Sequence, residues 1–398
     1  MRLRYTETEE AFRAELVEWL DRNAPPSEQF DAAKKSSASF TDWGREWQRT
    51  LFAAGWLLPG WPPELGGRHA SVGEQMIYYE EMSRRDILRS QNPQALGIIA
   101  PSLRDYGTPA QQERWLPDLV TYDKVGAWAI TEPDSGSDAF GGMKSYVVRA
   151  TDGTGDYILN GQKTFITNGP DADVVVVYAK LDEPGVDKRD RRVLTFVLDR
   201  GMDGFVQSKP FRKMGINSSR TGELFFSNVR LGRDRLLGET EGDGAASDGR
   251  ASARSNFSAE RIGVAAMALG VIEECLRLCV DYAKNRKLWG QEIGQFQLIQ
   301  LKLAQMELAR MNVRNMLFRV IEAMQTGTQI SLAEASAIKW YCSQAATDVA
   351  MDAVQLFGGN GYMTEYRVEQ LARDAKSLMI YAGSNEVQIT HVAKGLLS

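Results

Sequence analysis

The sequence contains few of the residues that build metal centres, disulfide frameworks or hydrolytic triads. Only three cysteines and two histidines occur among its 398 residues. The cysteines, Cys275, Cys279 and Cys342, lie inside helical patterns rather than in paired spacings, and no ligand cluster surrounds His69 or His391. We therefore expect the cysteines to fill the core, and we expect no metal site and no serine–histidine triad. Any chemistry must come from carboxylates or from a bound organic cofactor.

Long apolar runs and blocks of like charge are also lacking. No stretch reaches the roughly 18 apolar residues that a membrane span needs, and residues 1–10 lack the apolar core of a signal peptide. The 47 basic and 52 acidic residues give a net charge of -5 and do not cluster. We therefore expect a cytoplasmic protein with no membrane span and no nucleic-acid partner. The length allows two or three domains.

Hydrophobic periodicity predicts a helical N-terminal domain at residues 1–124. Thr6 and Glu9 have the spacing of a capping box, and Phe12 and Leu16 begin an amphipathic stripe behind them. Proline and glycine residues between positions 58 and 67 interrupt the pattern. Helical periodicity then returns at 76–82 and 96–106.

The hydrophobic pattern changes from helical to strand-like in residues 125–237, and this change predicts a middle β domain. Asp152-Gly153 and Asn160-Gly161 are typical of tight turns between strands. Small and polar residues at 238–255 predict a linker loop after this domain. The expected strands cover 146–150, 174–178, 193–198 and 223–226.

Helical periodicity resumes in residues 256–398 and predicts an antiparallel bundle. The order of helices, strands and helices gives an α+β fold and narrows the architecture more than any single motif does. No Gly-x-Gly-x-x-Gly sequence follows a strand, so a Rossmann nucleotide site is not supported. The expected helices cover 260–286, 297–325, 331–356, 368–379 and 387–397.

Five motifs, in order along nearly the whole chain, resemble those of the acyl-CoA dehydrogenase family. The resemblance implies the acyl-CoA dehydrogenase fold, with an N-terminal helical domain, a middle β-barrel-like domain and a C-terminal four-helix-type bundle. It also implies FAD as cofactor, an electron-transfer flavoprotein or similar acceptor, and a homotetramer in which neighbouring subunits complete each cofactor site. The motifs are AITEPDSGSD at 129–138, NGQKTFITNG at 160–169, KMG at 213–215, RKLWG at 286–290 with Gln297, and QLFGGNGY at 355–362.

An isoalloxazine ring needs a flat wall against one face and hydrogen-bond partners at its polar edge. Trp128 with Thr131, and Phe165 with Thr167, each supply an aromatic ring and a hydroxyl group. The alternative is that both aromatic residues are ordinary core residues. Family members usually carry Trp where this chain has Phe165. The resemblance adds two FAD-binding positions, Ile130 and Ser137, and gives Ser137 a second role in binding substrate.

The pyrophosphate and adenosine of FAD need charged donors and close backbone approach. Arg286 suits the first need, and by resemblance it reaches the FAD of a neighbouring subunit together with Gln297. Gly358 and Gly359 suit the second, although two glycines could instead simply end a helix. The resemblance implies further FAD contacts from Phe296, Gln355, Ser384 and Glu386.

Removal of a proton α to a thioester requires a carboxylate base. Many family members carry this Glu in the last loop, where the present chain has Ala382. A second subgroup, like isovaleryl- and long-chain-type dehydrogenases, carries it on the first bundle helix before an Arg, as in Glu260-Arg261. No cation lies three or four residues from Glu260, and its small neighbours should raise its pKa. We therefore expect Glu260 to be the base and Arg261 to bind substrate, the alternative for Glu260 being an exposed residue near a helix start.

The acyl carrier and two rival functions stay open in the sequence. The polar segment before Glu260 is longer than the family's usual linker, and Arg220 replaces the usual Asp or Asn near the pantetheine entrance. The substrate is thus an acyl-CoA or an acyl-carrier-protein thioester, which dehydrogenation turns into the 2-enoyl thioester. The rivals are a flavin monooxygenase on the same fold, which lacks a carboxylate base, and a catalytically silent partner subunit, which the intact flavin motifs disfavour.

Overall fold

The computed structural model describes residues 5–26, 42–85, 87, 90, 92–241 and 249–397. Contacts between residues divide the chain into two compact units. The α/β unit contains Tyr5–Arg212 and Asn217–Asn256, and the helical unit contains Lys213–Ile216 together with the residues from Phe257 onward. Among the described residues, no helix is both long and apolar enough to cross a membrane.

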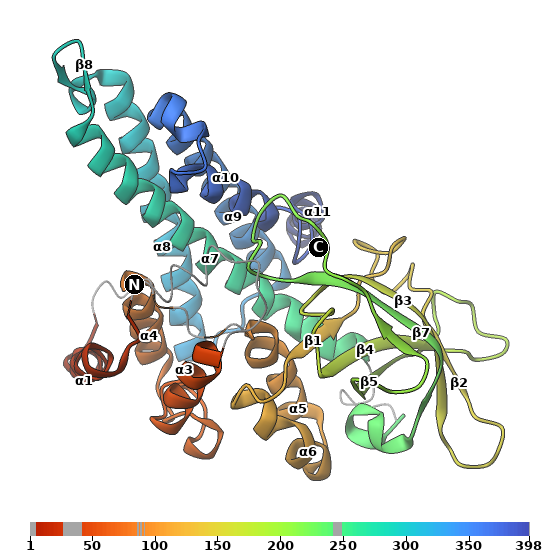
Figure 1. Cartoon of the computed structure of the whole chain (residues 1–398). Coiled ribbons are helices and arrows are strands. Elements are labelled where there is room, and N and C mark those ends of the chain that lie inside the picture. Colours follow the sequence, from red (N-terminus) through yellow and green to blue (C-terminus); the bar gives the residue numbers. More distant parts are fainter. Residues whose placement is uncertain are drawn as a thin grey trace. The chain divides into compact units, whose positions relative to one another are not determined.

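The α/β unit begins with short helices, drawn from red to orange in Figure 1. Thr6 and Glu9 form the predicted capping box, because the Thr6 N–H donates to Glu9 Oε2 at 2.8 Å and the Glu9 N–H donates back to Thr6 Oγ1. Phe12 and Leu16 are buried, as the amphipathic pattern predicts. The helices are α1 (Glu7–Asn23), α3 (Asp42–Ala53), a 3-10 turn (Pro63–Leu65), α4 (Val72–Arg84), a π-helical turn (Ala95–Ile99), α5 (Ala100–Tyr106) and α6 (Pro109–Val120).

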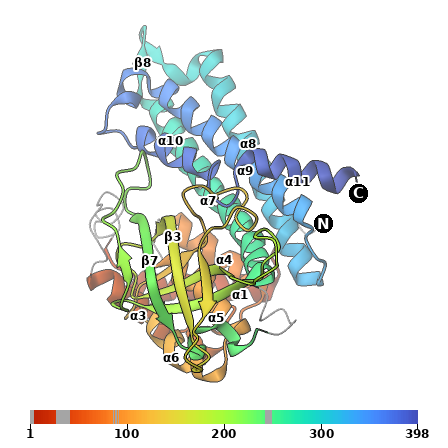
Figure 2. The same ribbon diagram turned by 90° about the vertical axis from the view of Figure 1, so that its right-hand side faces the viewer.

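A seven-stranded mixed sheet forms the rest of this unit, with strand order β1-β4-β2-β3-β7-β6 and with β5 paired to β4. The strand β4 is buried along its whole length, and β3 lies beside β7, as Figure 2 shows. The pairs of β4 with β1 and β2 are parallel, and its pair with β5 is antiparallel. The strands are β1 (Gly126–Ala129), β2 (Tyr146–Arg149), β3 (Tyr157–Thr167), β4 (Val174–Leu181), β5 (Val193–Asp199), β6 (Phe205–Gln207) and β7 (Thr221–Leu231).

One predicted turn of the β domain is wrong. Asp152-Gly153 does lie in the turn between β2 and β3, where Gly153 has a φ of +80°. Asn160-Gly161 instead lies inside β3, at a register shift against β7. Gly161 has a φ of +146°, and a Cβ there would come within 2.3 Å of Ser145 Oγ. The glycine is therefore required by an irregularity and a close approach in the sheet, rather than by a turn.

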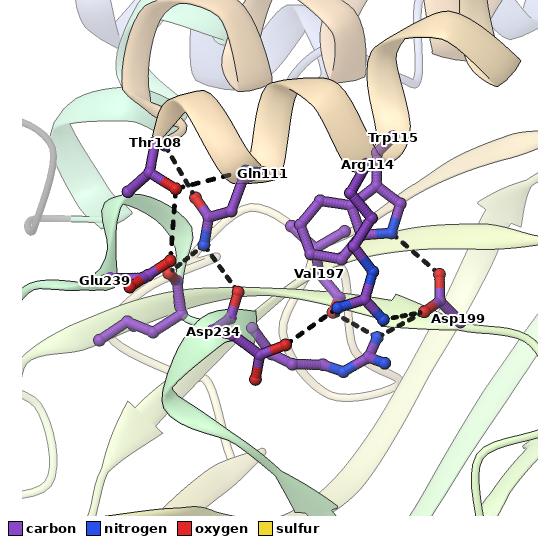
Figure 3. Close-up of polar contacts among 10 residues, drawn as sticks. Thr108, Gln111, Arg114, Trp115, Val197, Asp199, Asp234 and Glu239 are labelled. Carbon is purple, nitrogen blue, oxygen red and sulfur yellow. Dashed lines mark hydrogen bonds and ion pairs between the residues drawn. The ribbon is translucent and has the colours of Figure 1, made fainter.

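Buried polar contacts fasten α6 to the sheet (Figure 3). Gln111 Nε2 donates to the carbonyls of Asp234 and Leu236 at 2.8 and 2.7 Å, in the segment after β7. The Trp115 indole N–H donates to Asp199 Oδ1 on β5 at 2.9 Å. These contacts join the N-terminal helices and the sheet within one unit.

Gln111→Ala is expected to lower the free energy of unfolding by about 2–4 kcal/mol, because the buried Leu236 carbonyl, the partly buried Asp234 carbonyl and the Gly238 N–H lose their partner. Urea unfolding followed by circular dichroism measures this loss. Gln112→Ala is the matched control, since its amide donates to carbonyls nearer the surface, and it should cost less than about 1 kcal/mol. Equal losses in the two variants would contradict the assigned role of Gln111.

Long helices form the helical unit, with α9 packed against α8, α10 and α11. Figure 1 shows the β8–β9 hairpin at the end of the unit where α7 meets α8. Cys275, Cys279 and Cys342 are buried with free thiols, as expected of core residues. The elements are α7 (Gly249–Asn285), β8 (Lys287–Leu288), β9 (Gln291–Glu292), a 3-10 turn (Ile293–Gln295), α8 (Gln297–Thr326), α9 (Leu332–Phe357), a 3-10 turn (Gly358–Tyr362), α10 (Arg367–Leu378) and α11 (Asn385–Leu397).

The helix α7 begins at Gly249, inside the segment expected to be a linker loop. Gly249 packs closely on the β domain, since a Cβ there would come within 2.8 Å of Thr195 Oγ1 and of the Val193 carbonyl oxygen. Arg250 Nη2 donates to the carbonyls of Arg189 and Arg191 at 2.9 and 2.8 Å. Tertiary contacts thus hold the start of α7, which the polar composition of the segment did not predict. Residues 242–248 of the expected loop lie outside the described residues.

Candidate active site

The predicted flavin residues of the β domain lie on β1, on the segment after it and at the end of β3. Trp128 lies on β1 and donates from its indole N–H to the Tyr178 hydroxyl at 3.2 Å. The Thr164 N–H donates to the Thr131 carbonyl at 2.9 Å, so Thr131 lies beside the end of β3. The two segments that carry an aromatic ring and a hydroxyl are therefore joined directly. The remaining residues of the first segment are the buried Ile130 and the exposed Ser137.

Phe165 is both exposed and conformationally strained. Its φ is +58°, and 67% of the residue is accessible to solvent. It lies in a register shift between Lys163 and Ile166, two residues before Thr167. A bulky residue is uncommon in the left-handed region, and such strain concentrates at functional sites. Phe165 is therefore not an ordinary core aromatic, and its exposed ring fits a site for a flat ligand.

In the helical unit, Arg286, Phe296 and Gln297 flank the β8–β9 hairpin. The Ile293 N–H donates to the Arg286 carbonyl at 2.8 Å, while Phe296 precedes α8 and Gln297 is its first residue. Trp289 lies at the hairpin tip with 84% exposure and a φ of +51°, and its ring centroid is 5.8 Å from that of Phe296. Sequence reasoning missed Trp289 as a candidate binding residue, although it lies inside the RKLWG motif.

Tyr282 joins this hairpin end to the two glycines after α9. Its ring stacks on Phe357 with centroids 4.0 Å apart, and its hydroxyl accepts from Asn360 Nδ2 at 3.0 Å. A Cβ added to Gly358 or Gly359 would meet no atom within 4 Å. The chain's own packing therefore leaves open space at the glycines, as close approach of a ligand or a second chain requires. On the last turns of α9 the exposed Gln355 belongs to the same end.

Glu260 lies on α7 and is partly buried. Burial raises the pKa of its carboxyl group to about 7, against the opposing charges of Arg261 and Lys339. A carboxyl group that changes protonation near neutral pH suits a general base. Arg261 is only 5% exposed, and its Nε and Nη1 find no acceptor among the described residues. The next residue to Glu260 thus offers donors to a bound group.

Buried polar side chains support the loop that contains Ala382. The Lys339 ammonium donates to the Gly383 carbonyl at 2.8 Å and to Asn385 Oδ1 at 3.0 Å. Gln388 Nε2 donates to the Ala382 carbonyl at 3.0 Å. Ala382 itself has a φ of +56°. The backbone of this loop is firmly held, yet Ala382 offers no acid. The predicted FAD contacts here are Ser384 in the loop and the exposed Glu386 in the first turn of α11.

The predicted residues of the helical unit form two separate groups. Glu260 lies on the continuous helix α7, and Arg286 directly follows the last residue of that helix, 26 residues further along the chain, which is about 39 Å at 1.5 Å per residue. The first group, the base group, is Glu260, Arg261, Ser384 and Glu386. The second group, the hairpin group, is Arg286, Phe296, Gln297, Gln355, Gly358 and Gly359.

Comparison with known proteins matches the chain to all three domains of one family. Sequence models of the N-terminal, middle and C-terminal domains of acyl-CoA dehydrogenase match residues 6–123, 127–229 and 247–397. An acyl-CoA dehydrogenase of Bacillus subtilis is 37% identical over 344 residues, covering 84% of this chain and 85% of the relative.

Solved structures agree with the sequence matches. An acyl-CoA dehydrogenase from Geobacillus kaustophilus superposes with a TM-score of 0.84 at 32% identity, and 100% of each chain is covered. A glutaryl-CoA dehydrogenase from Mycobacterium smegmatis in complex with FADH2 superposes with a TM-score of 0.79 at 25% identity, covering 98% of this chain and 95% of the other. The predicted fold is confirmed. The chain therefore belongs to the acyl-CoA dehydrogenase family and is an FAD-dependent enzyme that oxidises acyl-CoA.

Proposed function

We propose that Glu260 is the base that removes the α proton of the acyl thioester, which places this chain in the subgroup with the base on the first bundle helix. The supporting observation is its carboxyl group, whose pKa burial raises to about 7. Above that pH the carboxylate is ionised and, in its partly desolvated position, more basic than an ordinary Glu carboxylate. Ala382, at the alternative position, cannot accept a proton.

The exposed aromatic ring, the adjacent hydroxyls and the open glycines fit FAD. Trp128, Ile130, Thr131, Phe165 and Thr167 would hold its isoalloxazine ring, which accepts the β hydride when FAD is bound. Ser137 and Arg261 are proposed to bind substrate. Arg261 has buried N–H groups that lack acceptors among the described residues, and donors already in place stabilise the charge that develops on a thioester oxygen. The product is the 2-enoyl thioester.

The hairpin group serves the FAD of a neighbouring subunit in a homotetramer. The base group and the hairpin group are separated by about 39 Å along α7, which is longer than one FAD molecule. One cofactor therefore cannot reach Glu260 and Arg286 of the same chain. The bundle also carries exposed apolar side chains suited to subunit contacts, including Leu298 and Leu301 on α8 and Met351 on α9. Sedimentation equilibrium of the FAD-loaded protein tests the tetramer.

Anaerobic addition of acyl-CoA to the FAD-loaded enzyme tests the proposed function. We expect the flavin absorbance near its visible maximum to bleach within one turnover, because α,β-dehydrogenation passes two electrons to the flavin. Bleaching by NADH alone would instead indicate a monooxygenase. A colourless purified protein would indicate a silent subunit and would overturn the proposal.

A panel of thioesters then defines the substrate and the acceptor. Short, branched and long acyl groups, each offered on coenzyme A and on an acyl-carrier protein, are compared by kcat/KM. An electron-transfer flavoprotein is the proposed acceptor, and a dye replaces it as the reference. Turnover with carrier-protein thioesters alone would assign the carrier alternative.

A further inference from the structure

A charged pair lies fully inside the β domain, and the proposed chemistry makes no use of it. Lys163 on β3 is 0% exposed and Glu132, after β1, is 4% exposed. Lys163 Nζ lies 2.8 Å from Glu132 Oε1. The same ammonium group donates to the Ile130 carbonyl at 3.1 Å. The pair therefore ties β3 to the segment after β1 through both a side chain and a backbone carbonyl.

Glu132 extends this connection to a third segment, at the start of β2. Its Oε2 accepts from the Lys144 N–H at 2.6 Å, and its Oε1 accepts from the Ser145 N–H at 3.0 Å. Its backbone exchanges hydrogen bonds with Ser135, which closes the turn after β1. One carboxylate thus organises three stretches of chain that are distant in sequence.

Stability alone does not explain why charges occupy this position. Removing two charges from water costs several kcal/mol per ion, and well-packed apolar residues often serve equally well. A buried ionic pair with fixed hydrogen bonds does specify one geometry, because sliding any partner leaves a charge unsatisfied. The pair is therefore suited to setting the register of the segments that it joins.

Those segments are the ones that carry the proposed flavin contacts. Ile130 and Thr131 lie directly before Glu132, and the Ile130 carbonyl is itself a partner of Lys163. Phe165, with its φ of +58°, lies two residues after Lys163. The Thr164 N–H between them donates to the Thr131 carbonyl at 2.9 Å. The buried pair thus directly supports the two segments that carry Thr131 and Phe165.

We propose that Glu132 and Lys163 form a positioning pair that holds residues 130–131 and 165–167 in the spacing that FAD binding requires. This inference rests on the proposed FAD contacts of the β domain. It predicts that loss of the pair weakens FAD binding beyond any loss of fold stability.

The test compares FAD binding with fold stability in Lys163→Met and Glu132→Gln. Apoprotein is titrated with FAD by fluorescence quenching, the visible spectrum of bound flavin is recorded, and urea unfolding of the apoprotein gives stability. We expect FAD affinity to fall about tenfold or more, as when outer support of a metal ligand is removed, with a shifted flavin spectrum. Glu132→Gln keeps the side-chain shape, so it supplies the comparison if Lys163→Met does not fold.

Arg13→Met is the matched control. It breaks another ion pair of the α/β unit, in which Nη1 of the half-buried Arg13 on α1 lies 2.6 Å from Oε1 of the buried Glu81 on α4. We expect this variant to lose stability while its FAD affinity stays within about twofold of wild type. If the Lys163 and Glu132 variants behave like this control, the positioning role is overturned. If the wild-type protein itself binds no FAD, the proposed function fails instead.

Discussion

Glu260→Gln is expected to bind FAD and acyl-CoA yet turn over roughly 10²–10⁴-fold more slowly than wild type, because an amide cannot accept the α proton. Single-turnover bleaching of the flavin by acyl-CoA measures the chemical step directly. In the wild type, kcat/KM should rise with pH through about 7, as the carboxyl group of Glu260 ionises. The variant should lose this rise of kcat/KM with pH, which is called the limb below. Retention of more than a few per cent of activity would place the base elsewhere.

Glu260→Gln is also expected to stabilise the folded chain at alkaline pH, although it slows turnover. Burial raises the pKa of Glu260 from 4.5 to about 7, so ionisation is harder in the folded chain than in the unfolded one. Stability is therefore lost as pH rises from 4.5 to 7, by an amount on the order of 3 kcal/mol. Glu260→Gln should be more stable than wild type at pH 8 and about equal at pH 4. A variant that is less stable at both pH values would not be a clean test of catalysis.

A carboxylate returned at position 382 provides a rescue experiment. Glu260 contributes to raising the pKa of Tyr381, the residue directly before Ala382, so the two positions are electrostatically coupled. Ala382 already has a φ of +56°, so replacing it with Glu adds no new backbone strain of this kind. We expect Ala382→Glu to restore part of the bleaching rate of Glu260→Gln. Ala382→Gln in the same background is the control, and equal rates in the two double variants would exclude base relocation.

Periodicity predicted the elements that local sequence determines. The helices α8, α9 and α10 begin and end within about one residue of expectation, because apolar spacing and caps such as Ser331 mark their limits. The strand β3 was missed where Asn160-Gly161 suggested a turn. The start of α7 was missed because Gly249 and Arg250, which begin the helix, are held by contacts with the β domain. In both places tertiary packing outweighed local preference.

The candidate site likewise contains residues that the sequence predicted and residues that it did not. The motifs predicted Glu260 and Phe165 as site residues, and the structure shows that they lie on α7 and β3. The strained φ of Phe165 and the buried state of Lys163 have no signal in sequence. A lysine is mostly exposed, so nothing distinguishes Lys163 or Lys339 from surface lysines before the chain folds. Such supporting residues emerge only from burial and hydrogen-bond partners.

Lys339→Met is expected to change both the stability of the chain and the pH dependence of turnover. The buried ammonium group donates to the Gly383 carbonyl and to Asn385 Oδ1, and both acceptors would lose a charged donor. We expect the free energy of unfolding to fall by about 2–4 kcal/mol. The loop that carries Ser384 should become less rigid, so FAD affinity should fall as well.

The pH effect of this change has a defined direction. Burial raises the pKa of Glu260, and Lys339 and Arg261 oppose the rise, so removing the Lys339 charge should move the limb of kcat/KM above about 7. Arg261 remains as the other cation that acts on Glu260. The ionisable groups around the loop include Tyr381, Glu386, His391, Asp374 and Lys376. Lys394→Met removes an exposed cation from α11 and is the control that should leave the limb in place. A limb that stays put, or moves to lower pH, in Lys339→Met would show that this buried cation does not act on the base.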